Sequence, residues 1–223
     1  MLINIIMPKE YEYAFLFDEN IKEHDIKRKL KQMKEKHMKP MMFSIMVYSH
    51  PSNDKDTYIR LRDEGIKKTF TVKTKLGSKF VTELETTVDD IKIVNDMLIV
   101  LGCKLLYTVE KLREIWTIDY VGKEDVEVVF DSYPGLPTYM EIETDSEDKL
   151  NKFCKKLGLD PSQRYQGGGL YDELYGLPKN RKVGGNLTFK SAKKVFLKII
   201  TKNKKIFNDT LKKQQEYIDK YLT

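Results

Sequence analysis

Six short stretches of this sequence carry two like charges separated by one residue. The acidic pairs are Glu10 and Glu12, Glu83 and Glu85, and Glu141 and Glu143; the basic pairs are Arg60 and Arg62, Lys73 and Lys75, and Lys111 and Arg113. On a β-strand, this spacing places both charges on one face and the residue between them on the other. A solvated face explains any single pair. Six like-charged pairs on separate strands favour faces that turn toward a shared interior.

Acids and bases that face one another inside a rolled-up sheet would form a site for a metal and an anion. Asp131, which follows the apolar run 128–130, would join the acids. Buried charges persist only when they are paired or bound to metal. Carboxylate oxygens bind hard cations such as Mg²⁺ or Mn²⁺, and Arg and Lys hold phosphate oxygens. The combination predicts a polyphosphate site suited to phosphoryl transfer.

The residues around these pairs predict a chain of mostly antiparallel strands with a few helices between them. Alternation predicts strands over residues 10–18, 40–49, 57–65, 69–78, 79–87, 104–122, 126–137 and 137–144. Apolar spacing predicts helices over 19–37, ended by Pro40, over 88–102, and over 146–158. We therefore expect an α+β fold, a closed eight-stranded antiparallel β-barrel with helices packed outside.

The length of 223 residues allows one substantial domain with an appendage. We expect a barrel domain over residues 1–190 and a basic, helical C-terminal extension over 191–223 that packs on the barrel. No apolar run reaches the roughly 18 residues of a membrane span, and no leader pattern is present, which predicts a cytoplasmic protein with no membrane partner. The net charge of +6 weakly favours an anionic partner.

The order and spacing of these motifs resemble the CYTH group of triphosphate tunnel metalloenzymes. That group includes class IV adenylyl cyclases, thiamine triphosphatases, inorganic triphosphatases and the RNA triphosphatases of mRNA capping. The likeness covers about Glu10 to Gly176 and is carried by EYEYA, YIRLRDEG, TFTVKTKL, TELET, EKLREIWTID and VVFDSYPGLPTYMEIET. The stretch FDSYPGLPTYMEIE is the most specific of these.

The resemblance implies a tunnel that binds a triphosphate together with one or two Mg²⁺ or Mn²⁺ ions. The implied metal ligands are Glu10, Glu12, Asp131, Glu141 and Glu143. The implied catalytic groups are Glu83, Glu85, Asp131 and Lys73. The implied phosphate-binding residues are Arg60, Arg62, Lys73, Lys75, Lys111 and Arg113.

One position departs from the family pattern. The first-strand motif of the family is Glu-x-Glu-x-Lys, and Ala14 occupies the lysine position here. We expect one of three consequences of the absent lysine: activity is lower, Lys9 or Lys73 takes over its role, or the reaction is a different one.

The activity expected first is metal-dependent hydrolysis of an inorganic, nucleoside or organic triphosphate. The alternatives are a class IV-type adenylyl cyclase, an RNA 5′-triphosphatase, or a non-catalytic triphosphate binder. The expected partner is a triphosphate small molecule or nucleotide, with an RNA 5′ end as an alternative. We expect a monomer or a homodimer.

Overall fold

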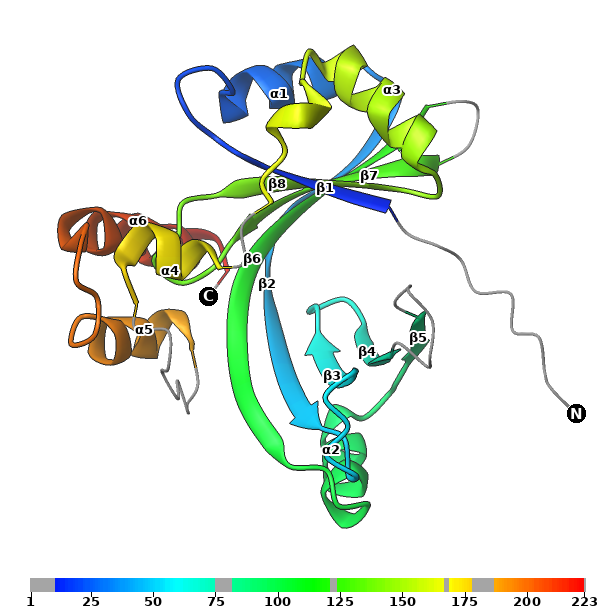
Figure 1. Ribbon diagram of the computed structural model, residues 1–223, viewed down its shortest axis with the longest axis vertical. Coiled ribbons are helices and arrows are strands. Elements are labelled where there is room, and N and C mark those ends of the chain that lie inside the picture. Colours follow the sequence, from blue (N-terminus) through cyan, green and yellow to red (C-terminus); the bar gives the residue numbers. More distant parts are fainter. Residues whose placement is uncertain (1–10, 75–81, 121–123, 167–168, 178–186, 223) are drawn as a thin grey trace, which may run out of the picture.

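The computed structural model describes residues 11–74, 82–120, 124–166, 169–177 and 187–222 (Figure 1). The strands are β1 (Tyr11–Leu16), β2 (Glu35–Ser49), β3 (Thr57–Asp63), β4 (Lys68–Thr74), β5 (Thr82–Thr87), β6 (Leu105–Asp119), β7 (Glu124–Ser132) and β8 (Tyr139–Thr144). The helices are α1 (Glu23–Leu30), α2 (Ile91–Val100), α3 (Glu147–Leu157), α4 (Leu170–Tyr175), α5 (Phe189–Phe196) and α6 (Lys204–Tyr221), with a 3₁₀ turn at Pro161–Gln163.

The strands form one antiparallel sheet in the order β1-β8-β7-β6-β2-β3-β4-β5. The long strands β2 and β6 curve through the middle of the sheet and join β1, β8 and β7 to β3, β4 and β5 (Figure 1). The α+β class, the eight antiparallel strands and the outer helices are confirmed. Closure differs from the prediction: a barrel needs a hydrogen-bonded ladder between its end strands, and in the described residues β1 pairs only with β8 and β5 only with β4.

The helix predicted to reach His37 is much shorter in the structure. It ends at Leu30, and the strand β2 begins at Glu35 and runs through Pro40. Proline cannot donate a ladder hydrogen bond, so it is tolerated in a sheet mainly at edges and bulges. The pairing of β2 with β6 shifts between Met38 and Met41, and this irregularity accommodates Pro40. Pro40 therefore marks a bend in a strand and not the end of a helix.

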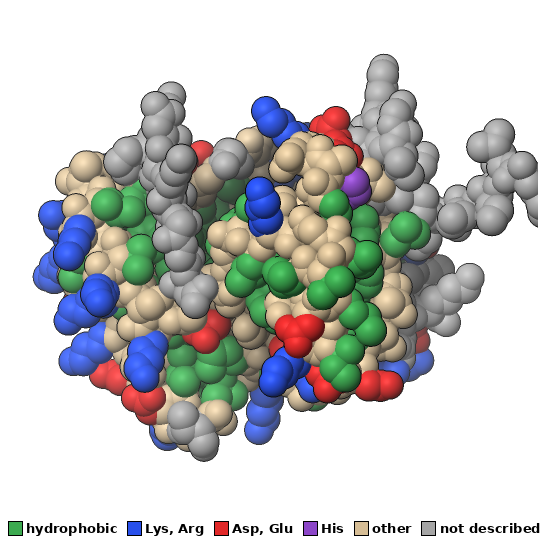
Figure 2. Space-filling model, turned by 90° about the horizontal axis from the view of Figure 1, so that it is seen from below, with side chains coloured by type: hydrophobic (Ala, Val, Ile, Leu, Met, Phe, Trp, Pro, Cys, Tyr) green, Lys and Arg blue, Asp and Glu red, His purple; other side chains and the backbone are tan. Residues whose placement is uncertain are grey.

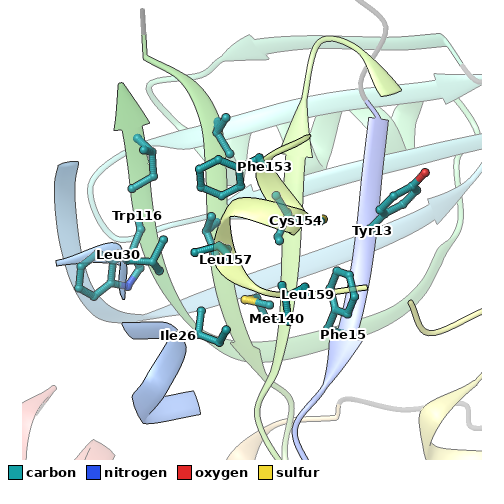
Figure 3. Packing of buried hydrophobic residues seen from close by; sticks show 14 of the residues in the cluster. Tyr13, Phe15, Ile26, Leu30, Trp116, Met140, Phe153, Cys154, Leu157 and Leu159 are labelled. Atoms are coloured by element: carbon teal, nitrogen blue, oxygen red, sulfur yellow. The ribbon is translucent and has the colours of Figure 1, made fainter. Parts of the chain in front are cut away.

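The apolar side chains of the strands pack outward against helices. Helices α1 and α3 cover β1, β6, β7 and β8 through a cluster that includes Phe15, Trp116, Met140 and Phe153 (Figure 3). A second cluster joins α2 to β2 and β3. Because apolar and charged residues alternate along each strand, this packing leaves the charged face of the sheet on the concave side.

The C-terminal helices α4, α5 and α6 form a third apolar cluster with β6 and the loop between β7 and β8. The buried side chain of Gln214 on α6 fastens this loop: its Oε1 accepts from the Gly135 N–H at 2.7 Å, and its Nε2 lies 2.7 Å from the Ser132 Oγ and 2.9 Å from the Leu136 carbonyl oxygen. Many exposed lysines lie on α5 and α6, where Figure 2 shows blue side chains on the left. The division of the chain at residue 190 stays a prediction.

No helix in the described ranges is long and apolar enough to span a membrane.

We expect Gly135→Ala to loosen the contact between the β7–β8 loop and α6. Gly135 has a φ of +79°, and a Cβ at this position would lie 2.3 Å from the Phe207 ring. Left-handed strain and overpacking together predict a loss of roughly 2–5 kcal/mol in the free energy of unfolding. Urea denaturation measures the loss.

Gly65→Ala is the matched control. Gly65 has a φ of +81°, but nothing lies within 4 Å of the added Cβ. This variant keeps the backbone strain and removes the clash, so it should lose only about 1–2 kcal/mol. Equal losses in the two variants would show that the clash of the added Cβ with Phe207 does not contribute to the loss in the free energy of unfolding.

Candidate functional site

Strand register brings the predicted charged residues onto the concave face of the sheet. On one side of the sheet, Glu12 lies opposite Glu143, and Glu143 lies opposite Glu127 on β7. One pleat further along, Ala14 lies opposite Glu141. Side chains in directly opposite positions have Cβ atoms about 4.5–5.5 Å apart. The face therefore holds a row of carboxylates on three adjacent strands.

This row of Glu12, Glu127 and Glu143, with Glu141 beside it, is short of positive charge. Burial, with the charges of Asp131 and Glu12, raises the pKa of Glu141 to about 7. Burial also raises the pKa of Glu143 to about 7; Arg113 opposes the rise, and Glu12 and Glu127 add to it. Burial disfavours ionisation of these two carboxylates, and repulsion by the neighbouring anions adds to the effect. A bound cation would relieve this repulsion.

Next to the row, Asp131 is held by two cations. Its side chain is fully buried, and its Oδ2 accepts from Lys111 Nζ at 2.6 Å and from Arg113 Nη2 at 2.6 Å. Its Oδ1 accepts from Arg113 Nε at 2.7 Å. Burial opposes ionisation, but the charges of Lys111 and Arg113 hold the pKa of Asp131 below its usual value. Arg113 Nη2 also donates to Glu141 Oε2 at 3.0 Å, which links this cluster to the carboxylate row.

The strands β3, β4 and β5 carry a second charged cluster. Arg60 Nη2 donates to Glu83 Oε1 at 3.1 Å, and Glu85 Oε2 accepts from the Thr71 hydroxyl at 2.7 Å. Arg62 Nη2 lies 3.3 Å from Glu85 Oε2, and Lys73 pairs with Glu83. Among the residues that the structure describes, the buried Nε atoms of Arg60 and Arg62 have no hydrogen-bond partner. Both guanidinium groups pair with carboxylates through Nη2, so in this arrangement their charge is directed to Glu64, Glu83 and Glu85.

A cavity of about 760 Å³ opens beside these two charged clusters. It is lined by Arg60 on β3, Lys111 on β6 and Glu141 on β8, so it receives groups from both charged clusters. Ala14 also lines it, beside Glu141. The alanine that replaces the family lysine therefore faces the cavity.

The donor set of the carboxylate row suits a hard divalent cation. Three glutamates share one row on adjacent strands, and Glu141 and Glu143 have raised pKa values. Within the described ranges, no three acidic, histidine or cysteine side chains converge as a formed metal site. The backbone register places the carboxylates on neighbouring strands, and binding of a cation would require their side chains to converge from this arrangement.

The structure brings most of the predicted site residues onto one face. Glu12, Asp131, Glu141 and Glu143 lie on one part of it with Lys111 and Arg113, and Arg60, Arg62, Lys73, Glu83 and Glu85 lie on the part formed by β3, β4 and β5. Glu10 and Lys75 lie outside the described residues. Their metal and phosphate roles stay predictions.

Sequence reasoning missed Glu127 and the aromatic lining of the cavity. Glu127 precedes Asp131 by four residues, so strand alternation already places the two on one face. Tyr58 precedes Arg60 by two residues, and Tyr139 precedes Glu141 by two. Extending two of the charged pairs by one step along their strands would have identified Tyr58 and Tyr139, and two steps back from Asp131 would have identified Glu127.

The fold agrees with comparisons to known proteins. The CYTH domain family model matches residues 8–165. The chain belongs to the CYTH domain family. No curated protein sequence matches it.

Three solved structures share the fold. A Vibrio parahaemolyticus protein, provisionally assigned as an adenylate cyclase, is 17% identical; the match covers 75% of this chain and 97% of that one, with a TM-score of 0.59. PH1012 of Pyrococcus horikoshii OT3 is 20% identical over 72% of this chain and 96% of that one, with a TM-score of 0.56. PH1819 of the same organism is 24% identical over 72% and 95%, with a TM-score of 0.52.

Proposed function

We propose that this protein hydrolyses a triphosphate with the help of Mg²⁺ or Mn²⁺ bound on the concave face. The observation that carries the proposal is the division of that face: a carboxylate row short of cations lies beside buried Lys and Arg side chains. The first part suits metal ions, and the second suits phosphate oxygens. A triphosphate–metal complex would satisfy both.

The metal ligands in this proposal are Glu12, Glu141 and Glu143, with Glu127 as an additional donor. Glu10 and Asp131, the other predicted ligands, stay candidates; both Asp131 oxygens already accept from Lys111 and Arg113. When bound, a divalent ion would neutralise phosphate oxygens and stabilise the charge that develops during phosphoryl transfer.

The phosphate chain would lie along the basic side chains of the cavity and its neighbourhood. Arg113 is a bidentate partner of Asp131, which fixes its guanidinium without consuming every N–H donor. Lys111 and Arg60 line the cavity and would contact the phosphates directly. Glu83 and Glu85, predicted to be catalytic, would orient Arg60, Arg62 and Lys73. Water would attack the terminal phosphorus in line, and the bond from that phosphorus to the bridging oxygen would break to give orthophosphate and the remaining diphosphate. These cations would stabilise the negative charge that develops on the phosphate oxygens.

A product assay separates this activity from its alternatives. The purified protein is incubated with tripolyphosphate, ATP and 5′-triphosphate RNA, each with Mg²⁺ and with Mn²⁺. Release of orthophosphate supports hydrolysis. Cyclic AMP with pyrophosphate would instead identify an adenylyl cyclase, which the fold shared with the Vibrio protein makes the second candidate. Binding without turnover would identify a triphosphate binder, and turnover of RNA alone an RNA 5′-triphosphatase.

Ala14→Lys is expected to change the rate. The new side chain would enter the cavity opposite Glu141. Its ammonium group would compensate the negative charge of that carboxylate and add a phosphate contact, so we expect kcat/KM to rise by about 10-fold, within the range of one added charge contact. Ala14→Met is the control for added volume without charge. No effect of lysine beyond that of methionine would show that this position has no part in the reaction.

Triphosphate binding is expected to weaken above neutral pH through Lys111. Burial, with the charge of Arg113, lowers the pKa of Lys111 to about 8, although Asp131 opposes the shift. The cation that binds phosphate is present below this pKa and is lost as the pH rises through it. The kcat/KM profile of the free enzyme should therefore fall above about pH 8. In Lys111→Arg this fall should move to higher pH; an unchanged profile would exclude Lys111 as its source.

A further inference from the structure

We propose that a lysine-rich surface on α5, the start of α6 and the segment between them binds the phosphate backbone of a nucleic acid strand without reading its sequence. We call it the lysine surface, and its members are Lys190, Lys193, Lys194, Lys198, Lys202, Lys204 and Lys205. It lies outside residues 8–165, which the family model matches. The inference goes beyond the proposed function and requires neither a bound metal nor a triphosphate.

Positive charge in this chain is concentrated in one stretch of the sequence. Residues 174–208 contain ten lysines and arginines and no aspartate or glutamate. The whole chain carries a net charge of +6, so the residues outside this stretch together carry a net charge of −4. Such segregation creates a local positive potential that attracts polyanions. The lysine surface is the part of this stretch that the structure describes.

The lysines of this surface are exposed and are not neutralised by neighbouring acids. Each of the seven is exposed, and within the described ranges no ion pair joins any of them to a carboxylate. A helix that merely carries solvated lysines often pairs them with acids one turn away. On α3, for example, Lys152 Nζ lies 2.6 Å from Asp148 Oδ2. The lysine surface offers its ammonium groups to an external anion.

The helices that carry the lysines are docked firmly on the rest of the protein. A capping box begins α5: the Thr188 Oγ1 accepts from the Ser191 N–H at 3.0 Å, and the Ser191 Oγ accepts from the Thr188 N–H at 3.0 Å. The buried rings of Phe196 on α5 and Phe207 on α6 stack with centroids 5.9 Å apart. The lysines therefore form an ordered surface, and Figure 2 shows blue side chains gathered on this side of the molecule.

A nucleic acid fits this surface better than an anionic membrane does. A helix that binds in a membrane interface inserts a continuous apolar face beneath its lysines. The apolar faces of α5 and α6 are already packed in the third apolar cluster, and Ile206 and Tyr221 are their exposed large apolar residues in the described ranges. Lysine ammonium groups contact phosphates as point charges and carry little information about bases. The expected ligand is therefore a hydrated chain of phosphates, bound through its backbone.

Fluorescence anisotropy with a labelled single-stranded RNA of about 20 nucleotides tests this inference. The RNA has a 5′-hydroxyl end, so it presents no triphosphate to the concave face. We expect the full chain to bind it with a dissociation constant of about 1–100 μM at physiological salt. Each phosphate contact with a single strand contributes a slope of about −0.7 to the logarithm of the association constant against the logarithm of the salt concentration. Four to seven contacts therefore predict a slope of about −3 to −5.

Two variants with equal charge changes separate the lysine surface from the net charge of the protein. The first replaces four of its lysines: Lys193→Gln, Lys194→Gln, Lys198→Gln and Lys202→Gln. The control replaces four exposed lysines elsewhere: Lys31→Gln, Lys55→Gln, Lys92→Gln and Lys104→Gln. The first variant should bind the RNA at least 10-fold more weakly and with a shallower salt slope, and the control should change binding less than about 2-fold. All eight positions are exposed, so both proteins should fold, and urea denaturation checks this.

Equal losses of binding in the two variants would overturn the inference, because net charge alone would then explain the affinity. Binding to phosphatidylserine vesicles or to long-chain polyphosphate without binding to the RNA would also overturn it. Neither variant changes a residue of the concave face. An absence of RNA binding would therefore overturn this inference and leave the proposed function intact.

Discussion

Glu141→Gln should have about 100- to 1,000-fold lower triphosphatase activity, which is the effect of removing one group that stabilises transition-state charge. Its free energy of unfolding should nevertheless be higher than that of the wild type. The activity falls because Glu141 is a proposed metal ligand beside the phosphate-binding cations. The stability rises because burial and the charges of Asp131 and Glu12 raise the pKa of Glu141 to about 7. An acid whose pKa is higher in the folded protein than in the unfolded chain lowers the free energy of unfolding once the pH exceeds its pKa in the unfolded chain. The pKa-dependent loss is complete above its pKa in the folded protein.

The gain is measured at pH 8, where glutamine removes the cost of keeping a buried carboxylate ionised beside other anions. We expect the free energy of unfolding to rise by about 1–3 kcal/mol in the absence of metal. Glu143→Gln should behave alike, because burial raises its pKa to about 7 as well. Glu216→Gln, at a site with a 65% exposed side chain, should change neither quantity. A Glu141→Gln protein with full activity would refute the metal assignment.

Arg113→Met should destabilise the protein and abolish triphosphate binding. The substitution leaves Asp131 fully buried with Lys111 as its remaining charged partner. Breaking a buried ion pair by removing one partner costs about 3–5 kcal/mol. The same change removes a buried cation that would neutralise phosphate oxygens. Urea denaturation and calorimetry with tripolyphosphate measure the two losses.

Two further variants separate structure from binding. Arg28→Met removes an ion pair with Asp25 at 2.7 Å on the exposed surface of α1, and it should cost less than about 1 kcal/mol. The double variant Arg113→Met with Asp131→Asn should not recover the stability, because it leaves the buried Lys111 ammonium without its Asp131 partner, and it should not recover binding. A double variant that binds tripolyphosphate as the wild type does would exclude Arg113 from the phosphate site.

Strand alternation was enough to predict which charged residues share a face. It needs only the neighbouring residues, and it correctly grouped Glu141 with Glu143 and Lys111 with Arg113. The prediction of a helix that Pro40 ends was wrong, because the bulge that tolerates a proline in β2 depends on the pairing with β6, a partner about seventy residues away in the sequence. Strand alternation could not predict that β1 and β5 remain apart in the described residues, since closure depends on the summed curvature of all eight strands.

The ion pairs of the site could not be predicted from the sequence. Arg60 reaches Glu83 because β3, β4 and β5 are in a particular register, which places Thr71 between Arg60 and Glu85. A slip of one residue in either pairing would send one of these side chains to the opposite face. The aromatic lining of the cavity includes Tyr171 on α4 and Phe196 on α5. Long-range packing decides how these two helices dock, so the sequence did not predict this lining.

A crystal structure with Mn²⁺ and tripolyphosphate would test whether metal and phosphates bind on the concave face, because the anomalous signal of manganese locates the metal independently of the phosphates. The account predicts a manganese peak among the carboxylates of Glu12, Glu141 and Glu143, with the phosphate chain running from there toward Lys111, Arg113 and Arg60. Manganese and phosphates bound away from the concave face, with these carboxylates unliganded, would contradict it.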